Sequence, residues 1–213
     1  REGLSVGLTT LLGTAQLAIQ DVLRKDVSAG RTPNVVIVSI GRAALQREYV
    51  EGEEEAKERM RRELEGSAAR LMEAHGWTPG GCGVLSLAIL VRSTHRDCQV
   101  LARTVNAFAR LTITDDAGSR VVPLVTPRGL LGRDHKPIPP GFIPLHDSLR
   151  LVSRDHISLT YRDLELTATL HGRNPTTLNG HPMTLGTSIA LAQGDVIRCG
   201  SCEIAVNDIE GRD

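Results

Sequence analysis

The chain has 213 residues, 40% of them hydrophobic, so it is long enough for one large domain or for two of about a hundred residues each. Its 25 basic residues balance its 25 acidic residues, and neither half has the basic excess that would bind nucleic-acid phosphates. Aromatic residues make up only 2%, which argues against stacking platforms for single strands, and the lack of an apolar run of about 18 residues argues against membrane insertion.

The first part of the chain is predicted to alternate between helix and strand. Residues 4–25 place apolar and small residues at helical spacing, so we expect a helix there. The sequence Arg-Thr-Pro-Asn at 31–34 then interrupts regular secondary structure, and the β-branched run at 35–40 predicts a short strand.

Residues 52–75 give the clearest helical signal in the chain. Three glutamates, 53–55, crowd the first turn, where the helix dipole favours negative charge, and Gly76 is placed to end the helix. An apolar stripe runs along one face, and the other face is highly charged. That charged face is either a partner surface or, as is typical of such pairings, a solvated surface.

Two apolar runs, 84–91 and 98–105, predict strands on either side of a polar turn. Residues 1–107 should therefore form an α+β domain with the order helix, strand, helix, strand, strand. Its cysteines and histidines lack metal-ligand spacing, and it has no acid–base or nucleophile set, so we expect no enzyme there. A nucleic-acid-binding role like that of KH domains is a further possibility for this domain, but its near-neutral charge would add no attraction to nucleic-acid phosphates.

From Arg110 onward the pattern changes to short apolar runs separated by Asp, Gly, Pro and Asn. Such regular spacing, without a helical segment, predicts an all-β sandwich or barrel over residues 108–213. The change of structural class puts the domain boundary near residues 106–109. The expected strands are 111–115, 121–125, 142–146, 149–153, 157–161, 164–172, 187–191, 195–200 and 202–206.

Three polar clusters fall at strand ends or loops of this predicted sandwich, where binding residues concentrate. They are Gly132-Arg133, the tetrad 153–156 (Ser-Arg-Asp-His) and the turn-like segment 172–180. Arginine forks bind phosphate oxygens bidentately, and a serine hydroxyl adds a short neutral donor. An asparagine amide can donate to and accept from the backbone of an extended peptide. No carboxylate pair, metal cage or nucleophile–base pair accompanies these groups, so the sequence indicates a binding site rather than a reaction centre.

Four motifs at these positions resemble those of forkhead-associated (FHA) domains. They are LLGR at 130–133, VSRDHISL at 152–159, NPTTLNG at 174–180 and GDVIRCGS at 194–201. The resemblance covers roughly residues 109–206 and implies an eleven-stranded β-sandwich that binds phosphothreonine peptides.

The resemblance also implies roles for individual residues. The phosphothreonine-binding set would be Arg133, Ser153, Arg154, Arg173 and Asn174, in which Asn174 holds the peptide backbone and Arg173 adds a phosphate contact. The residues that support the site would be Gly132, His156, Asn179 and Gly180, in which His156 braces the serine loop and Asn179-Gly180 forms a tight turn. Pro175 departs from the family, which usually has Gly after the Asn, and Gly172-Arg173 stands where a small hydroxyl pair is common.

The four cysteines, Cys82, Cys98, Cys199 and Cys202, are too few and too unevenly spaced for a secreted disulfide framework, which favours a cytoplasmic location. Cys199-Gly-Ser-Cys202 has no second ligand pair for zinc, and it falls where the family has a hairpin turn rather than a helix start. We therefore expect these cysteines to be structural, with no metal and no cofactor.

The N-terminal part resembles the domain that precedes the FHA domain in certain actinobacterial signalling proteins, which work with Ser/Thr kinases around cell-envelope synthesis and division. The whole chain is thus expected to be an adaptor. Its partners would be threonine-phosphorylated proteins, either a Ser/Thr kinase or a kinase substrate. The alternative is a phosphorylation-independent scaffold, in which the N-terminal domain pairs with itself as a homo-oligomer or with another chain.

Overall fold

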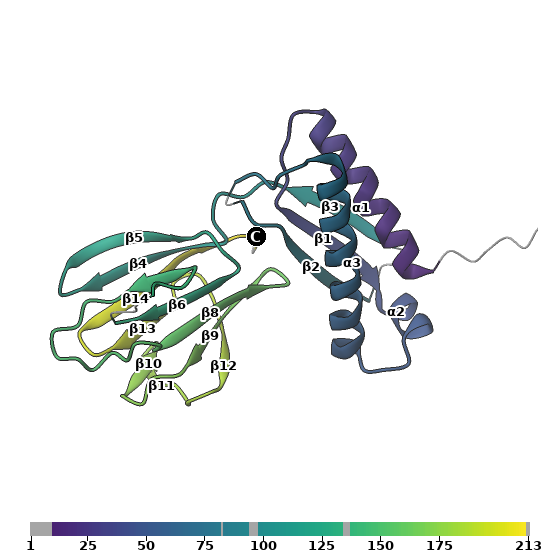
Figure 1. Cartoon of the computed structure of the whole chain (residues 1–213). Coiled ribbons are helices and arrows are strands. Elements are labelled where there is room, and N and C mark those ends of the chain that lie inside the picture. The colour runs from purple at the N-terminus through teal and green to yellow at the C-terminus, as the bar shows by residue number, and fades with distance from the viewer. Residues whose placement is uncertain (1–9, 82, 94–97, 134–136, 212–213) are drawn as a thin grey trace, which may run out of the picture. The chain divides into compact units, whose positions relative to one another are not determined.

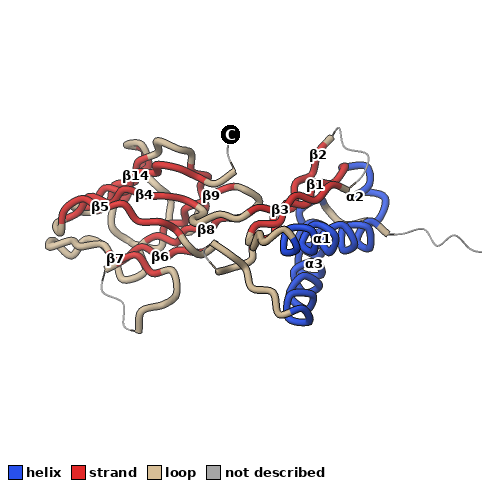
Figure 2. Tube along the Cα trace, turned by 90° about the horizontal axis from the view of Figure 1, so that it is seen from above, coloured by secondary structure: helices blue, strands red, loops and turns tan. Residues whose placement is uncertain are grey.

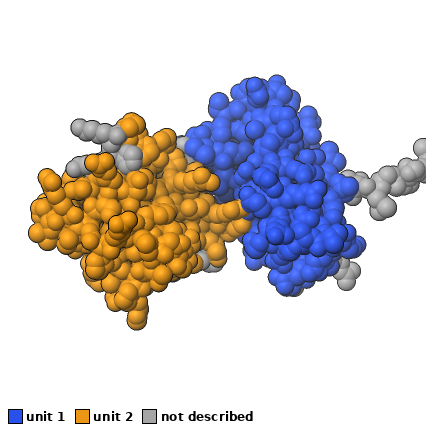
Figure 3. Space-filling view, turned by 60° about the horizontal axis from the view of Figure 1, so that its bottom comes forward, with its two compact units in different colours: residues 1–104 blue, residues 105–213 orange. Residues whose placement is uncertain are grey.

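The computed structural model describes residues 10–81, 83–93, 98–133 and 137–211. The chain divides into two compact units, residues 1–104 and residues 105–213 (Figure 3). The second unit begins at Val105, close to the boundary expected near residues 106–109.

The first unit is a three-stranded sheet with helices on one face (Figures 1 and 2). Strand β1 lies in the centre, parallel to β2 and antiparallel to β3, so β1, α3 and β2 form a parallel crossover. The elements are α1 (Leu11–Ser28), β1 (Val35–Gly41), α2 (Arg42–Glu48), α3 (Glu53–His75), β2 (Ser86–Arg92) and β3 (Gln99–Arg103).

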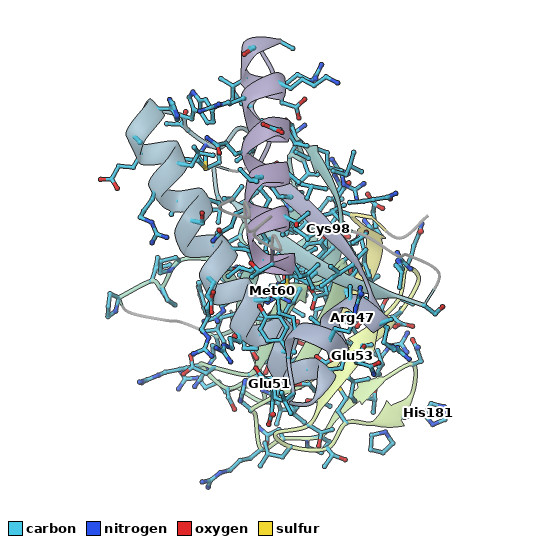
Figure 4. The ribbon with its side chains drawn as sticks, turned by 90° about the vertical axis from the view of Figure 1, so that its right-hand side faces the viewer. Arg47, Glu51, Glu53, Met60, Cys98 and His181 are labelled. Carbon is cyan, nitrogen blue, oxygen red and sulfur yellow. The ribbon has the colours of Figure 1, made fainter. Side chains whose placement is uncertain are left out.

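The core of the first unit lies between this sheet and the helices. Alternate β1 residues, Val36 and Val38, pack in one buried cluster with Ile19 of α1 and with Met60 and Leu64 of α3. Met60 is labelled in Figure 4. The expected end of α3 is confirmed, since Gly76 adopts φ 63° and caps the helix in the left-handed region.

Two helix predictions need correction. The helix expected at 4–25 begins at Leu11 and continues to Ser28, and residues 4–9 lie outside the described residues. The sequence analysis missed α2, which has only 7 residues and buries only Leu45, too little for a periodic signal. Tertiary contacts fix it: the Glu48 carboxylate accepts the backbone N–H groups of Leu11 and Leu12 at the start of α1.

The second unit is a β-sandwich of a six-stranded and a five-stranded sheet, as expected (Figure 1). The sheets have the orders β11-β10-β13-β14-β4-β5 and β12-β9-β8-β6-β7. The strands are β4 (Ala109–Asp115), β5 (Gly118–Leu124), β6 (Arg128–Gly132), β7 (Phe142–Pro144), β8 (Ile157–Arg162), β9 (Glu165–Leu170), β10 (Thr176–Leu178), β11 (His181–Pro182), β12 (Ser188–Leu191), β13 (Val196–Cys199) and β14 (Cys202–Ile209).

The core of the sandwich is aliphatic around one aromatic pair. Leu111 and Ile113 of β4 and Leu159 of β8 are buried, and the rings of Phe108 and Tyr161 lie 5.0 Å apart. Alternation along β4 and β8 puts these residues on the inner faces.

The strand expected at 149–153 is wrong, because this segment is a loop between β7 and β8. Arg150 has φ 56°, which no strand residue adopts, and the Asp147 carboxylate accepts the N–H of Val152 at 2.7 Å in place of a ladder bond. Val152 is buried, whereas Leu149 and Leu151 are exposed.

Candidate functional site

Three loops of the second unit are joined to one another by hydrogen bonds. They follow β6, precede β8 and connect β9 to β10. The N–H of Arg133 donates to the carbonyl of Ser153 at 2.9 Å, which ties the first loop to the second. The side-chain Nδ2 of Asn174 donates to the carbonyl of Leu151 at 2.6 Å, which ties the third loop to the second. Residues up to 41 positions apart in the sequence are thus brought together at one site.

Gly132 allows the first two loops to approach closely. A Cβ at this position would lie 1.6 Å from the carbonyl oxygen of Arg154 and 3.1 Å from that of Ser153. Only glycine therefore lets the backbone of β6 pass so near the 153–154 segment.

His156 links the second and third loops through both ring nitrogens. Its side chain is fully buried, Nδ1 accepts the N–H of Ser153 at 3.0 Å, and Nε2 lies 2.9 Å from Oγ1 of Thr176. Because Nδ1 is an acceptor, the ring proton is on Nε2 and is donated to Thr176. The Thr176 hydroxyl then donates to the carbonyl of Asn174 at 3.2 Å. The imidazole thus positions the backbone at both Ser153 and Asn174.

The charge state of His156 follows from its burial. Desolvation lowers the pKa of His156 below 6.5 and outweighs the nearby carboxylate of Asp147, which raises it. The ring is therefore neutral at neutral pH and acts as a brace, so the positive charge at the site comes from arginines. Gly172 makes room for this ring, because a Cβ there would lie 2.0 Å from Nδ1 of His156.

Several side-chain donors around these loops have no hydrogen-bond partner among the described residues. The buried Nε of Arg133 has no hydrogen-bond partner within the described part of the chain, an unusual state for a buried guanidinium nitrogen. Arg154 and Arg173 are exposed, and the side chains of both, like the Ser153 hydroxyl, make no hydrogen bond or ion pair with described residues. These donors therefore remain available to an anion.

The structure brings most of the candidate residues together. Backbone contacts join Arg133, Ser153 and Arg154, while Arg173 and Asn174 lie on the third loop. Asn179 and Gly180, at φ 52° and 82°, form the two-residue turn between β10 and β11. The Asn179 side chain bonds Asp195 at 2.8 Å and the N–H of Val196 at 2.9 Å, so it holds the hairpin against β13 rather than contacting the three loops.

Sequence reasoning missed Asp147, which is 7% exposed. Besides Val152, its carboxylate accepts the hydroxyl of Ser201, at 3.2 Å, from the β13–β14 turn. Asp147 therefore anchors the serine loop to a fourth segment. The local signal was the turn-forming composition of His-Asp-Ser-Leu-Arg at 146–150, in which the N–H of Arg150 donates to the Asp147 carbonyl at 3.1 Å.

Cys199 and Cys202 face each other across the β13–β14 ladder as buried thiols. Burial raises the pKa of Cys199 to about 12 and that of Cys202 to about 11. Both thiols are thus protonated at neutral pH, which suits a packing role and not thiolate chemistry. Within the described ranges, no group of three or more His, Cys, Asp or Glu side chains is arranged to hold a metal. No helix formed by those residues is long and apolar enough to cross a membrane.

Part of the second unit matches a known protein family. The family model of the FHA domain matches residues 130–200, which include all three loops. A comparison with curated proteins returned no match. The N-terminal unit lies outside the residues that the family model matches, so its resemblance to actinobacterial signalling proteins stays a prediction.

Several solved structures are similar to part of the chain. One is the FHA domain of FhaA, solved with the intracellular domain of Rv3910; it is 29% identical over 46% of this chain and 99% of that chain, with a TM-score of 0.37. Another comes from work on phosphothreonine-dependent FHA domain interactions. It is 30% identical over 46% of this chain and 96% of that chain, with a TM-score of 0.38. Full-length Pml1p of yeast is 20% identical over 46% of this chain and 79% of that chain, with a TM-score of 0.40. The family model matches residues 130–200, and these residues lie in the β-sandwich described above. Residues 130–200 of this chain are therefore an FHA domain.

Proposed function

We propose that the second unit binds a phosphothreonine peptide and that the protein is an adaptor recruited to threonine-phosphorylated partners. Arg133, Ser153 and Arg154 would bind the phosphate, and Arg173 would add a further positive charge. Asn174 would hold the peptide backbone, since one Nδ2–H is used by Leu151 while Oδ1 accepts no hydrogen bond from the described residues.

The chemistry of these groups suits a phosphate dianion. A phosphorylated threonine carries close to two negative charges at neutral pH and presents three strong acceptor oxygens. Guanidinium and hydroxyl donors satisfy such a group with charge-assisted hydrogen bonds, which are stronger than neutral ones. An aspartate mimic offers one charge and a planar carboxylate, so it should bind poorly.

One observation carries the proposal: the unpartnered, buried Nε of Arg133 beside a loop that Gly132 and His156 hold in place. Burying an unsatisfied charged donor costs stability unless a ligand completes it. The surrounding structure thus holds an unfavourable group ready for an anion, as is typical of a preformed binding site.

In the cell, such an adaptor would act downstream of a Ser/Thr kinase, which would create the mark that the site reads. The partner would be that kinase or one of its substrates. The role of the first unit stays a prediction, with self-association and pairing to another chain both open.

The proposal can be tested by fluorescence anisotropy with three peptide pools that differ only in carrying phosphothreonine, phosphoserine or unmodified threonine. The full chain should bind the phosphothreonine pool selectively and more weakly as salt rises, because the attraction is largely electrostatic. Equal weak binding of all three pools would contradict the proposal. Partner capture that survives phosphatase treatment would instead favour the phosphorylation-independent scaffold.

A further inference from the structure

A groove of about 460 Å³ lies between helices α1 and α3 of the first unit, and the proposed phosphopeptide site uses none of its residues. The two helices lie side by side on one face of the sheet (Figures 1 and 4). Each helix lines the groove with residues at the spacing i, i+3, i+4 and i+7, which places them on one helical face. On α3 this spacing runs from Leu64 to Leu71. On α1 the residues are Gly13, Gln16, Leu17 and Gln20.

The groove has a buried apolar floor and an exposed apolar lip. Ile19 and Leu64 in the floor are only 3% and 0% exposed, and both belong to the packed core of the first unit. The floor is therefore preformed. Leu17 at the lip is 58% exposed, so its side chain is placed to contact an apolar ligand. The volume falls within the range of about 300–1,000 Å³ that is typical of small-molecule sites.

The groove also carries polar side chains that have no partner in the described part of the chain. The side chains that make no hydrogen bond or ion pair with described residues are Gln16, Gln20, Ser67 and Arg70. Ser67 and Arg70 are three residues apart on α3 and are therefore neighbours on the helix surface, so one ligand group can accept hydrogen bonds from both. Among the described residues that line the groove, Arg70 alone is charged. The groove is thus complementary to a ligand with an apolar body and one negative charge.

We infer that this groove binds a single-chain amphipathic carboxylate, such as a medium-chain fatty acid. The carboxylate accepts hydrogen bonds from Arg70 and Ser67, and the alkyl chain lies on the apolar floor and against Leu17. The inference does not depend on the proposed function, because the groove lies wholly within the first unit.

Two other occupants fit the charges of this surface less well. An anionic membrane would be repelled by α3, which carries seven Glu against five Lys or Arg residues. A second copy of the chain would bring two Arg70 side chains to one symmetric interface, and no described Asp or Glu lines the groove to pair with them. A single anionic molecule avoids both problems.

The test is calorimetric titration of the full chain with decanoate, decanol and hexanoate. Decanoate should bind about three- to tenfold more tightly than decanol, the effect of one partly exposed charge pair. It should bind at least about tenfold more tightly than hexanoate, which has four fewer methylene groups to bury. Arg70→Ala should lower the affinity for decanoate to that for decanol and leave decanol binding unchanged. The matched control is Arg62→Ala, also exposed on α3, which does not line the groove.

A second pair of variants tests the apolar contact. Leu17→Asp should weaken decanoate binding by at least about tenfold, because it replaces an apolar contact with a repelling carboxylate. Its control is Leu101→Asp on β3, which is 60% exposed and does not line the groove, and which should bind decanoate like the wild type. Circular dichroism checks that both variants are folded.

Several results would overturn the inference. They are a lack of decanoate binding at millimolar concentration, equal binding by Arg70→Ala and the wild type, and equal losses in Arg70→Ala and Arg62→Ala. Binding to phosphatidylglycerol vesicles without binding of decanoate would assign the groove to a membrane. Dimers in light scattering that Leu17→Asp dissociates would assign it to a second copy. Either assignment replaces the carboxylate and overturns the inference, whereas phosphopeptide binding by the same samples stands or fails separately.

Discussion

Among single residues, Gly132 is the position where the smallest change should do the most damage. Its Cβ in Gly132→Ala would lie 1.6 Å from the Arg154 carbonyl oxygen, so the 153–154 backbone must move away. We expect a destabilisation of about 1–3 kcal/mol, as for other overpacked sites. Phosphopeptide affinity should fall at least about tenfold, the equivalent of 1.4 kcal/mol. Thermal unfolding and anisotropy measure the two effects.

A matched control for this substitution is Gly52→Ala, at the start of α3. Gly52 has φ −61°, and an added Cβ would meet no atom within 4 Å, so binding should stay close to that of the wild type. Stability should fall by no more than about 1 kcal/mol, because Gly52 is the N-cap of α3 and alanine is a poorer N-cap than glycine. If Gly132→Ala binds as tightly as the wild type, the close approach of the two loops has no role in binding.

Motif composition could identify residues such as Arg133 and Ser153 as candidates, because their donor chemistry is visible in the sequence. Their role in binding stays a prediction. Asp147 could not be found in this way, since its function depends on contacts with Val152 and with Ser201, which is 54 residues away. The same holds for Gly172, whose importance comes from the His156 ring that packs against it.

At the scale of elements, the loops before β8 and after β9 are coupled through the neutral ring of His156. We expect NMR of ¹⁵N-labelled histidine to show the proton on Nε2, because Nδ1 accepts the Ser153 N–H. The ring should titrate below the ordinary pKa of 6.5, because burial disfavours the charged form. A proton on Nδ1, or a titration at or above pH 6.5, would contradict this assignment.

The same pKa shift sets a direction for stability. The unfolded chain takes up a proton at His156 near pH 6.5, whereas the folded protein does so only at lower pH. The stability contributed by neutral His156 is therefore fully present above pH 6.5 and is lost as pH falls from 6.5 through the lowered pKa. Free energies of unfolding of the ligand-free protein across this range measure the effect without the titration of the phosphate.

Elements with a strong local pattern could be predicted from the sequence, and those fixed by tertiary contacts could not. The β-branched strand β1 and the capped helix α3 lie where their patterns indicate. The run 149–153 looks like a strand because its leucines alternate, but Asp147 and the positive φ of Arg150 make it a loop. Strands β10 and β11 are only 3 and 2 residues long, too short to show a period of two.

At the scale of the whole molecule, the second unit closes on itself. Its first and last strands pair, with Ala109 opposite Ile209, and the N–H of Glu210 donates to the carbonyl of Phe108 at 2.9 Å. A fragment of residues 105–213 should therefore fold and bind the phosphothreonine pool within about twofold of the full chain, because all the candidate binding residues belong to the second unit. Circular dichroism and anisotropy test both points; an unfolded fragment or a much weaker one would show that the first unit is required.

The change of class from α+β to all-β could be read from the sequence because the hydrophobic period switches from helical to alternating after about residue 108. The boundary predicted near residues 106–109 differs slightly from the start of the second unit at Val105. The reason is that Val105 and Ala107 are buried outside any strand and carry no periodic signal. The N-terminal unit has a clear fold, but it lies outside the residues that the family model matches, so its role stays a prediction.

The most direct test of phosphothreonine binding compares Arg133→Ala with Arg128→Ala at the opposite end of β6. Arg128 is exposed, and its side chain makes no ion pair or hydrogen bond with described residues, so it controls for the loss of one positive charge. Arg133→Ala should weaken binding of the phosphothreonine pool by at least about thirtyfold, the loss expected when one partner of a hydrogen-bonded charge pair is removed. Its thermal stability should not fall, because the buried Nε has no partner among the described residues to lose. If Arg133→Ala keeps its affinity within about twofold of the wild type, or if Arg128→Ala loses as much, Arg133 is not the phosphate ligand and the proposed site is wrong.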